Sequence, residues 1–184
     1  MSKNGRYKKI AGCLVVLTIC IISLFSSGCI GRALSKNFAR DIQKNSNFEF
    51  GILQEITEES VFEDYYVVPG FGITGYVDKK YGENYDKQEI STYVQYSVSS
   101  WPDVLSKKKY ITGIDCHDEK YTLYGLKIGD AYEEWQRGLK EKGFKEKDGR
   151  FYYNCIRINV NYRDGLVFSF SIFADSTNFS GIQF

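Results

Sequence analysis

Hydrophobic and polar side chains alternate most regularly near the end of the chain, over residues 156–162 and again over residues 166–173. A period of two predicts two β-strands, each with one apolar and one polar face. Asp164 and Gly165 stand between them, and this pair suits a tight hairpin turn because the turn needs positive φ. Residues 150–153 predict a third strand, so the pattern indicates an antiparallel sheet.

A helical period precedes these strands. Apolar residues recur every four positions and form one stripe, made of Ala131, Trp135 and Leu139. Asp130 and Glu133 have the spacing of a capping box, which predicts that Asp130 caps the start of the helix. Gly143 suits the left-handed residue that ends a helix, and we expect Phe144 to pack back on it.

The first half of the chain shows a similar order of elements. Apolar residues at 61, 62, 65 and 66 predict a short helix that stops before Pro69 and Gly70. Three strands are predicted after it, at residues 72–81, 93–98 and 110–116. The sequence therefore predicts an α+β fold of two αβββ units, residues 48–120 and 121–184, in which an antiparallel sheet packs on short helices.

Residues 1–28 have the three-part layout of a secretory signal peptide. Basic residues lie between Lys3 and Lys9, an apolar run follows from residue 10 to residue 25, and small residues precede Cys29. We expect residues 29–47 to form a polar tether. The signal peptide could be cut off before Cys29 and a lipid attached to that cysteine. Two alternatives remain open: the apolar run stays uncut and anchors the protein as a helix, or it is cut off and the protein is released. All three place the folded domain outside the cytoplasm.

Ser27, Gly28 and Cys29 resemble the end of the lipobox of bacterial lipoproteins, with Ser26 standing where that motif usually has leucine. The resemblance implies cleavage before Cys29 and a diacylglycerol group on its thiol. It also implies frequent acylation of the new amine. Two or more acyl chains hold a protein stably on a bilayer, so we expect a protein that is lipid-anchored on the extracytoplasmic face of the cell membrane.

A second resemblance lies in the segment from Tyr124 to Asp130, followed by the predicted helix, by Gly143-Phe144 and by the closing strands. This pattern is similar to small uncharacterised lipoproteins of Gram-positive bacteria. Two αβββ units in tandem resemble the beta-lactamase inhibitor proteins, and a single unit resembles the small assembly lipoproteins of the SmpA/BamE type. The resemblance implies a surface-exposed binding module that is not an enzyme.

The charge of the chain narrows the list of partners. Four basic residues and no acidic residue precede Cys29, which leaves 20 basic against 23 acidic residues in the rest of the chain, a net charge of −3. No basic stripe remains to cover a phosphate backbone, so we do not expect nucleic acid as a partner. The expected partners are the lipid bilayer, through acylated Cys29, and an envelope or secreted protein.

Two cysteines, Cys116 and Cys155, belong to the expected domain. An extracytoplasmic location permits a disulfide between them, and a domain of this size does not require one. A disulfide bridge and two separate thiols therefore remain alternatives.

Residues 116–119, Cys-His-Asp-Glu, form the one cluster with ligand-like side chains, and it holds the only histidine of the chain. A structural zinc site needs four ligands, and a second such element is missing. Cys116 and His117 do not suit a nucleophile and its base, because neighbouring residues of a strand point to opposite faces. The acidic loop from Asp78 to Glu89 lacks the spacing of a calcium loop. We expect no metal, no cofactor and no catalytic residue.

The remaining candidate is one face of the predicted sheet. If the apolar positions of the strands face the helices, the opposite face carries Tyr93, Gln95, Arg157, Asn159, Ser169, Ser171 and Phe173. Tyrosine and arginine are frequent anchors of protein interfaces, so this face is the candidate binding surface, with a plain solvated face as the alternative. The expected function is non-enzymatic protein binding. A structural envelope protein without a specific ligand, or a cell-wall hydrolase, is the alternative.

Overall fold

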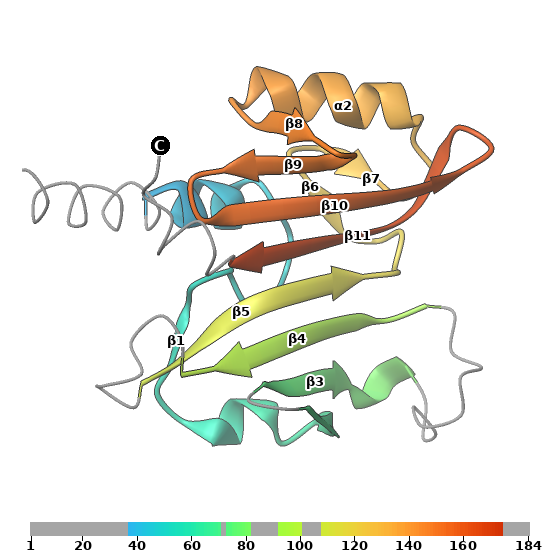
Figure 1. Ribbon diagram of the computed structural model, residues 1–184. Helices are drawn as coiled ribbons and strands as arrows, with labels where there is room; N and C mark the ends of the chain where they lie inside the picture. Colours follow the sequence, from blue (N-terminus) through green and yellow to red (C-terminus); the bar gives the residue numbers. More distant parts are fainter. Residues whose placement is uncertain (1–36, 71–72, 82–91, 101–107, 175–184) are drawn as a thin grey trace, which may run out of the picture.

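The computed structural model describes residues 37–70, 73–81, 92–100 and 108–174 (Figure 1). The expected signal peptide, residues 1–28, and the expected lipidation site, Cys29, lie outside the described residues, and so does most of the acidic loop. The described part has an α+β fold. It combines a large antiparallel sheet with two α-helices, one at residues 37–44 and the other, α2, at Tyr132–Glu141.

Nine strands of the described chain form one sheet, and eight of them follow the order β2-β3-β4-β5-β11-β10-β9-β8. The first half of the chain contributes β2 (Tyr65–Pro69), β3 (Thr74–Asp78), β4 (Val94–Ser99) and β5 (Lys109–Cys116). The second half contributes β8 (Lys145–Lys147), β9 (Arg150–Tyr153), β10 (Ile156–Arg163) and β11 (Leu166–Ala174). The remaining short strands are β1 (Glu55–Ile56), which pairs with β5, and the pair β6 (Thr122–Leu123) and β7 (Leu126–Lys127). Strands β5 and β11 therefore join the two halves at the centre of the sheet.

The strands of the second half lie where the alternation predicts them. Asp164 and Gly165 take φ values of 52° and 79° in the hairpin between β10 and β11, which confirms the predicted turn. Strand β8 follows α2 and forms an edge that the sequence analysis did not include. The alternation of apolar and polar residues predicts β10 and β11 correctly because one face of each strand is buried in the core.

Helix α2 is confirmed, and its predicted cap is wrong. Trp135 and Leu139 are fully buried, and Gly143, with φ at 88°, follows the helix end as expected. The N-cap residue is Ala131, which makes no side-chain capping bond. Asp130 instead accepts a 2.9 Å hydrogen bond from the backbone N–H of Lys127, so its carboxylate stabilises the turn before the helix.

One expectation for the first half is wrong. The predicted helix near residues 61–66 is only one 3-10 turn, η1 (Glu59–Phe62), and Tyr65 already belongs to β2. The spacing of Phe62 and Tyr65 fits a helix as well as a strand. The strand forms because residues 65–69 pair with β3, and their aromatic and β-branched side chains favour extended backbone. Residues 37–44, which lie within the expected tether, are helical and bury Ala39 and Ile42.

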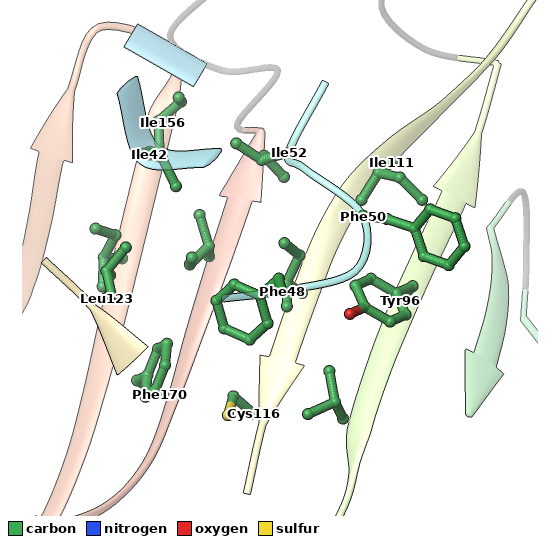
Figure 2. Close-up of a cluster of buried hydrophobic side chains, with 14 of the residues drawn as sticks. Ile42, Phe48, Phe50, Ile52, Tyr96, Ile111, Cys116, Leu123, Ile156 and Phe170 are labelled. Carbon is green, nitrogen blue, oxygen red and sulfur yellow. The ribbon is translucent and has the colours of Figure 1, made fainter. Parts of the chain in front are cut away.

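One hydrophobic cluster packs on a single face of the sheet and connects both halves (Figure 2). The segment after the first helix places Phe48 and Phe50 over the strands. Phe48 contacts Phe170 of β11, with ring centroids 6.0 Å apart, and Phe50 contacts Tyr96 of β4 at 5.1 Å. This segment therefore joins the two halves into one core, and it leaves the other sheet face for polar residues.

Candidate functional site

The strand register places the seven candidate residues on the sheet face opposite the core. Gln95, Asp115, Ser171 and Asn159 are successive partners across β4, β5, β11 and β10. The remaining candidates lie on the same face, beside these four residues. Phe173 pairs with Arg157, Ser169 lies two residues before Ser171 on β11, and Tyr93 directly precedes β4. We call this surface, with Asp115 and His117 added, the polar face.

The polar face is less open than expected. Ser169 is fully buried and Ser171 is only 7% exposed, although the alternation places both on the face opposite the core. The other five candidate residues are half-buried. Their side chains pack on one another, and the contacts between them fix their orientation.

Asp115 is the centre of this packing. Its Oδ1 accepts a 2.6 Å hydrogen bond from Ser171 Oγ, and its Oδ2 lies 3.3 Å from Tyr93 Oη and 3.4 Å from His117 Nε2. The rings of Tyr93 and His117 stack, with centroids 4.4 Å apart. Burial alone would raise the pKa of Asp115, but the hydrogen bonds from His117 and Ser171 outweigh it and hold that pKa below its usual value.

Arginine and asparagine residues of β10 extend the polar face. The Arg157 guanidinium lies 5.0 Å from the centre of the Phe173 ring, which is a cation–π contact across β10 and β11. Asn161 Nδ2 donates a 2.9 Å hydrogen bond to Ser169 Oγ. Asn159 has a buried Oδ1 without a hydrogen-bond donor, an arrangement that costs about 1–3 kcal/mol where it persists.

Neighbouring residues at the end of β5 lie on opposite sides of the sheet, as strand geometry predicts. Cys116 is fully buried in the core, while His117 contacts Asp115 on the polar face. In the structure, no disulfide joins Cys116 to Cys155. Burial raises the pKa of the Cys116 thiol to about 12, so it is protonated and unreactive at neutral pH.

The order of groups in the polar face bears on its chemistry. A hydrolytic triad places histidine between the hydroxyl and the carboxylate, so that the imidazole takes the proton of the nucleophile. Here Asp115 stands between Ser171 and His117, and the Ser171 hydroxyl donates to the carboxylate. This arrangement fixes side chains in place and does not activate Ser171 as a nucleophile.

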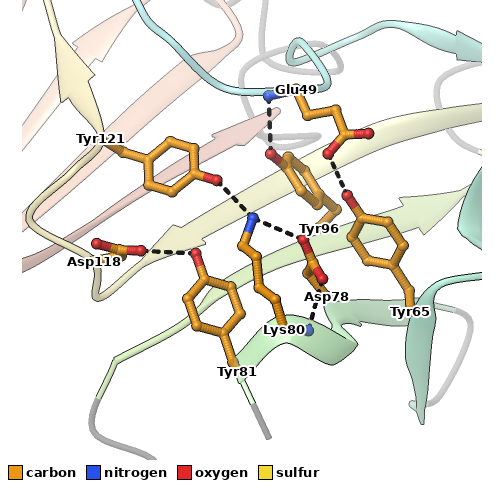
Figure 3. A network of polar contacts seen from close by, with 8 residues as sticks. All are labelled: Glu49, Tyr65, Asp78, Lys80, Tyr81, Tyr96, Asp118 and Tyr121. Atoms are coloured by element: carbon orange, nitrogen blue, oxygen red, sulfur yellow. Dashed lines mark hydrogen bonds and ion pairs between the residues drawn. The ribbon is translucent and has the colours of Figure 1, made fainter.

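A second polar cluster, which the sequence pattern does not reveal, joins residues of the first half to one another and to Tyr121 (Figure 3). Tyr65 Oη donates a 2.6 Å hydrogen bond to Glu49, and Tyr81 Oη donates a 2.9 Å bond to the buried Asp118. Lys80, in the 3-10 turn η2 (Lys79–Tyr81), has its Nζ 2.7 Å from the Asp78 carboxylate and 3.1 Å from Tyr121 Oη. Only the abundance of tyrosine signals such a cluster in the sequence.

These contacts fix the protonation states of the tyrosine cluster. Burial, together with the hydrogen bond to Glu49, raises the pKa of Tyr65 far above its ordinary value, and burial with the bond to Asp118 does the same for Tyr81. Burial would lower the pKa of Lys80, but its bonds to Asp78 and Tyr121 raise it overall. The tyrosines are neutral and Lys80 is charged at neutral pH, so the contacts of this tyrosine cluster stabilise the fold.

A pocket of about 310 Å³ opens beside the first helix, away from the candidate residues. Arg40, Gln43, Glu55 and Tyr110 are among the residues that line it. Glu55 is already paired with Lys108 at 2.8 Å. Gln43, which also lines the pocket, has a buried Oε1 without a hydrogen-bond donor.

The described residues contain no cluster of three or more His, Cys, Asp or Glu side chains that could hold a metal ion. Within that same part of the chain, none of the helices has the length and apolar character needed to cross a bilayer. No family model, curated protein or solved structure matches the chain. Its function is therefore argued from the sequence and from the geometry described above.

Proposed function

We propose that this protein is an extracytoplasmic lipoprotein, held on the cell membrane by acylated Cys29, which binds another envelope or secreted protein and catalyses no reaction. The observation that carries the proposal is the division of the sheet into two faces. The hydrophobic core and the helices lie on one face, and a continuous polar face with aromatic and arginine side chains lies on the other. Such side chains dominate the energetics of protein interfaces.

The contacts within the polar face support binding. Tyr93 is held by His117 and Asp115, and Arg157 is held against Phe173. Side chains that are already ordered lose little conformational entropy when a partner arrives, which favours tight association. The position of Asp115 between Ser171 and His117 favours this use over hydrolysis.

The entry point of the chain is consistent with a short membrane anchor. Phe38, at the start of the first helix, stacks on Tyr153 with ring centroids 3.9 Å apart. Asn37 is the eighth residue after Cys29, and a fully extended segment of that length reaches at most about 28 Å. A lipid on Cys29 would therefore hold the domain close to the membrane surface.

We also propose that the chain consists of two related units. Residues 37–116 and residues 132–174 each hold a helix followed by four strands that run in order from one edge of the sheet to its centre, β2 to β5 and β8 to β11, with the short strand β1 as an addition in the first. The expected αβββ unit thus gains one strand. A repeat of this kind would make the polar face a surface shared by both units.

The binding proposal is tested by capture from intact envelopes. Full-length tagged protein would be cross-linked in membranes, purified, and its companions quantified by mass spectrometry. The variants are Arg157→Ala with Phe173→Ala, and separately Tyr93→Ala. Val67→Ala is the control, because Val67 is 61% exposed on β2 and lies outside the polar face. Circular dichroism and thermal unfolding would show that each variant is folded.

The proposal predicts a companion protein that wild type and Val67→Ala enrich equally. Both polar-face variants should reduce its enrichment by about tenfold, which corresponds to roughly 1.4 kcal/mol of binding free energy. Equal enrichment by all variants, or no specific companion, would count against the polar face as the binding surface.

A further inference from the structure

Four basic side chains gather on one face of β8, β9 and β10, which lie side by side along one edge of the sheet (Figure 1). Lys147 pairs with Arg150 across β8 and β9. In the neighbouring row of paired residues, Lys145 pairs with Tyr152, and Tyr152 pairs with Arg157 of β10. Paired residues share a face of a sheet, and so do residues two apart on a strand. Lys145, Lys147, Arg150 and Arg157 therefore form one group beside the polar face, which we call the basic cluster.

Most of this cluster is open to solvent, unlike the centre of the polar face. Lys145, Lys147 and Arg150 are exposed, and none of the three has an ion-pair partner within the described part of the chain. Glu146, the acidic residue of β8, points to the opposite face, where it pairs with Lys140 of α2 at 2.8 Å. The carboxylate nearest in sequence to the two lysines is thus turned away from them.

Two other acidic residues border the basic cluster and do not cancel its charge. Asp148 lies in the turn between β8 and β9. Asp115 shares a row with Arg150 but stands three strands away on β5, where it already accepts a hydrogen bond from Ser171. Four basic side chains against Asp148 leave a net charge of +3, in a chain that carries −3 from Cys29 onward. The cluster is therefore a local concentration of positive charge.

Edge protection explains only part of the basic cluster. Lysine on an edge strand prevents pairing with another chain, and Lys145 and Lys147 lie on the edge strand β8. Arg150 and Arg157 lie on β9 and β10, which have a neighbouring strand on both sides and need no such protection. Like charges that face each other across two strands reduce the stability of a sheet, as Lys147 and Arg150 do here. A bound anionic group would offset this repulsion.

The size and composition of the basic cluster suit a short acidic segment of a protein. It measures about 10 Å across its three strands and about 7 Å between its two rows. Tyr152 stands between Lys145 and Arg157, and Phe173 lies 5.0 Å from the Arg157 guanidinium. Arginine pairs with carboxylates through two parallel hydrogen bonds, and arginine beside aromatic rings is frequent at protein interfaces.

The basic cluster faces away from the side at which the chain enters the domain. Phe38 marks that entry and stacks on Tyr153. Neighbouring residues of a strand point to opposite faces, so Tyr152 and the cations beside it lie on the other side of the sheet. A tether from Cys29 would therefore reach the face that carries the first helix. This arrangement favours a protein partner over the anionic headgroups of the anchoring bilayer.

We infer that the basic cluster binds an acidic segment of the partner protein, in which carboxylate groups pair with Arg150 and Arg157. The inference rests on the proposed binding function and names the chemistry of the partner. Complementary charge steers the encounter and fixes the register of the two proteins, while Tyr93 and Phe173 of the adjoining polar face supply apolar contacts.

A photo-reactive amino acid inside the basic cluster tests this inference. The full-length protein would be produced in its own cells with p-benzoylphenylalanine in place of Tyr152. Irradiation should give one discrete protein adduct, and peptide mapping should place the cross-link beside two or more Asp or Glu residues. Lys147→Glu with Arg150→Glu should lower the yield at least about tenfold, because like charges would then face each other. Lys120→Glu with Lys127→Glu is the control, since it changes the net charge equally at exposed positions outside the cluster.

Charge exchange makes the test specific. Replacement of the mapped acidic residues by lysine should restore the adduct of the Lys147→Glu, Arg150→Glu protein. An adduct with phospholipid, an adduct of twice the mass of this chain, a cross-link to a segment without acidic residues, equal yields from the two double variants, or no adduct would each overturn the inference. If Tyr93→Ala removes a captured protein from envelopes while position 152 gives no such adduct, the proposed function stands and only this inference fails.

Discussion

Ser171 Oγ donates a 2.6 Å hydrogen bond to Asp115 Oδ1, and this bond joins β11 to β5 where the two halves of the sheet meet. His117 contacts the other carboxylate oxygen. One acidic side chain therefore links both halves of the chain on the polar face, while Phe48 and its neighbours link them in the core.

This arrangement predicts a particular acid sensitivity. Because the pKa of Asp115 is lowered in the fold, its carboxylate adds stability above the ordinary value of 3.8, and this contribution is lost as the pH falls further. Asp115→Asn should be less stable than wild type at pH 7. Its unfolding free energy should fall less steeply as the pH drops below about 4, as measured by urea unfolding. Parallel pH curves for the two proteins would contradict the role given to Asp115.

The tyrosine cluster predicts a loss of stability at high pH. The pKa values of Tyr65 and Tyr81 are raised above the ordinary value of 10.0, so the unfolded chain loses these protons first as the pH rises. Stability should therefore be complete below about pH 10 and fall above it. The double variant Tyr65→Phe with Tyr81→Phe should show a shallower fall above about pH 10. An unchanged slope would mean that these hydroxyl groups do not titrate in the unfolding transition.

The core predicts a large effect at Trp135. Its side chain is fully buried, and its Nε1 donates a 3.0 Å hydrogen bond to the carbonyl of Lys127. Trp135→Ala should reduce the free energy of unfolding by about 3–5 kcal/mol. The exposed control Val67→Ala should change it by less than about 0.5 kcal/mol. Equal effects in chemical denaturation would show that the packing of α2 on the sheet is misplaced.

The two cysteines predict a simple chemical result. Cys116 and Cys155 are both buried and are not joined by a disulfide. In the mature protein, a thiol reagent should therefore react slowly in the native state and with two thiols once the chain is unfolded without reductant. Two thiols that react rapidly in the native protein would contradict their burial. No reactive thiol after unfolding would reveal a bridge.

The sequence is most informative where one period dominates. The strict alternation of β10 and β11 and the four-residue spacing in α2 predict their elements, because each buries only one face. Residues 61–66 have a spacing that suits a helix and a strand equally, and pairing with β3 decides between them. The sequence around residues 37–44 is polar and mixed, which indicates a tether, while the helix that forms there packs on distant partners such as Tyr153.

The candidate site was predictable in outline only. Alternation assigns Arg157, Asn159 and Phe173 to one face, and the register then sets which of them touch. Asp115 did not stand out because its role depends on partners more than fifty residues away, such as Ser171. A β-bulge, which leaves Phe168 of β11 without a partner residue on β10, is also invisible in the alternation, since a single extra residue changes which side chains face outward.

The attachment of the chain to the membrane is the claim on which the functional account depends most. Full-length wild type and Cys29→Ala would be produced in a bacterial host with a labelled fatty acid, and the intact mass of the membrane fraction would be measured. The account predicts label in wild type, a mass that starts at residue 29, and loss of both in Cys29→Ala. Unlabelled protein with the mass of the full-length chain would contradict it and would indicate an uncleaved anchor helix.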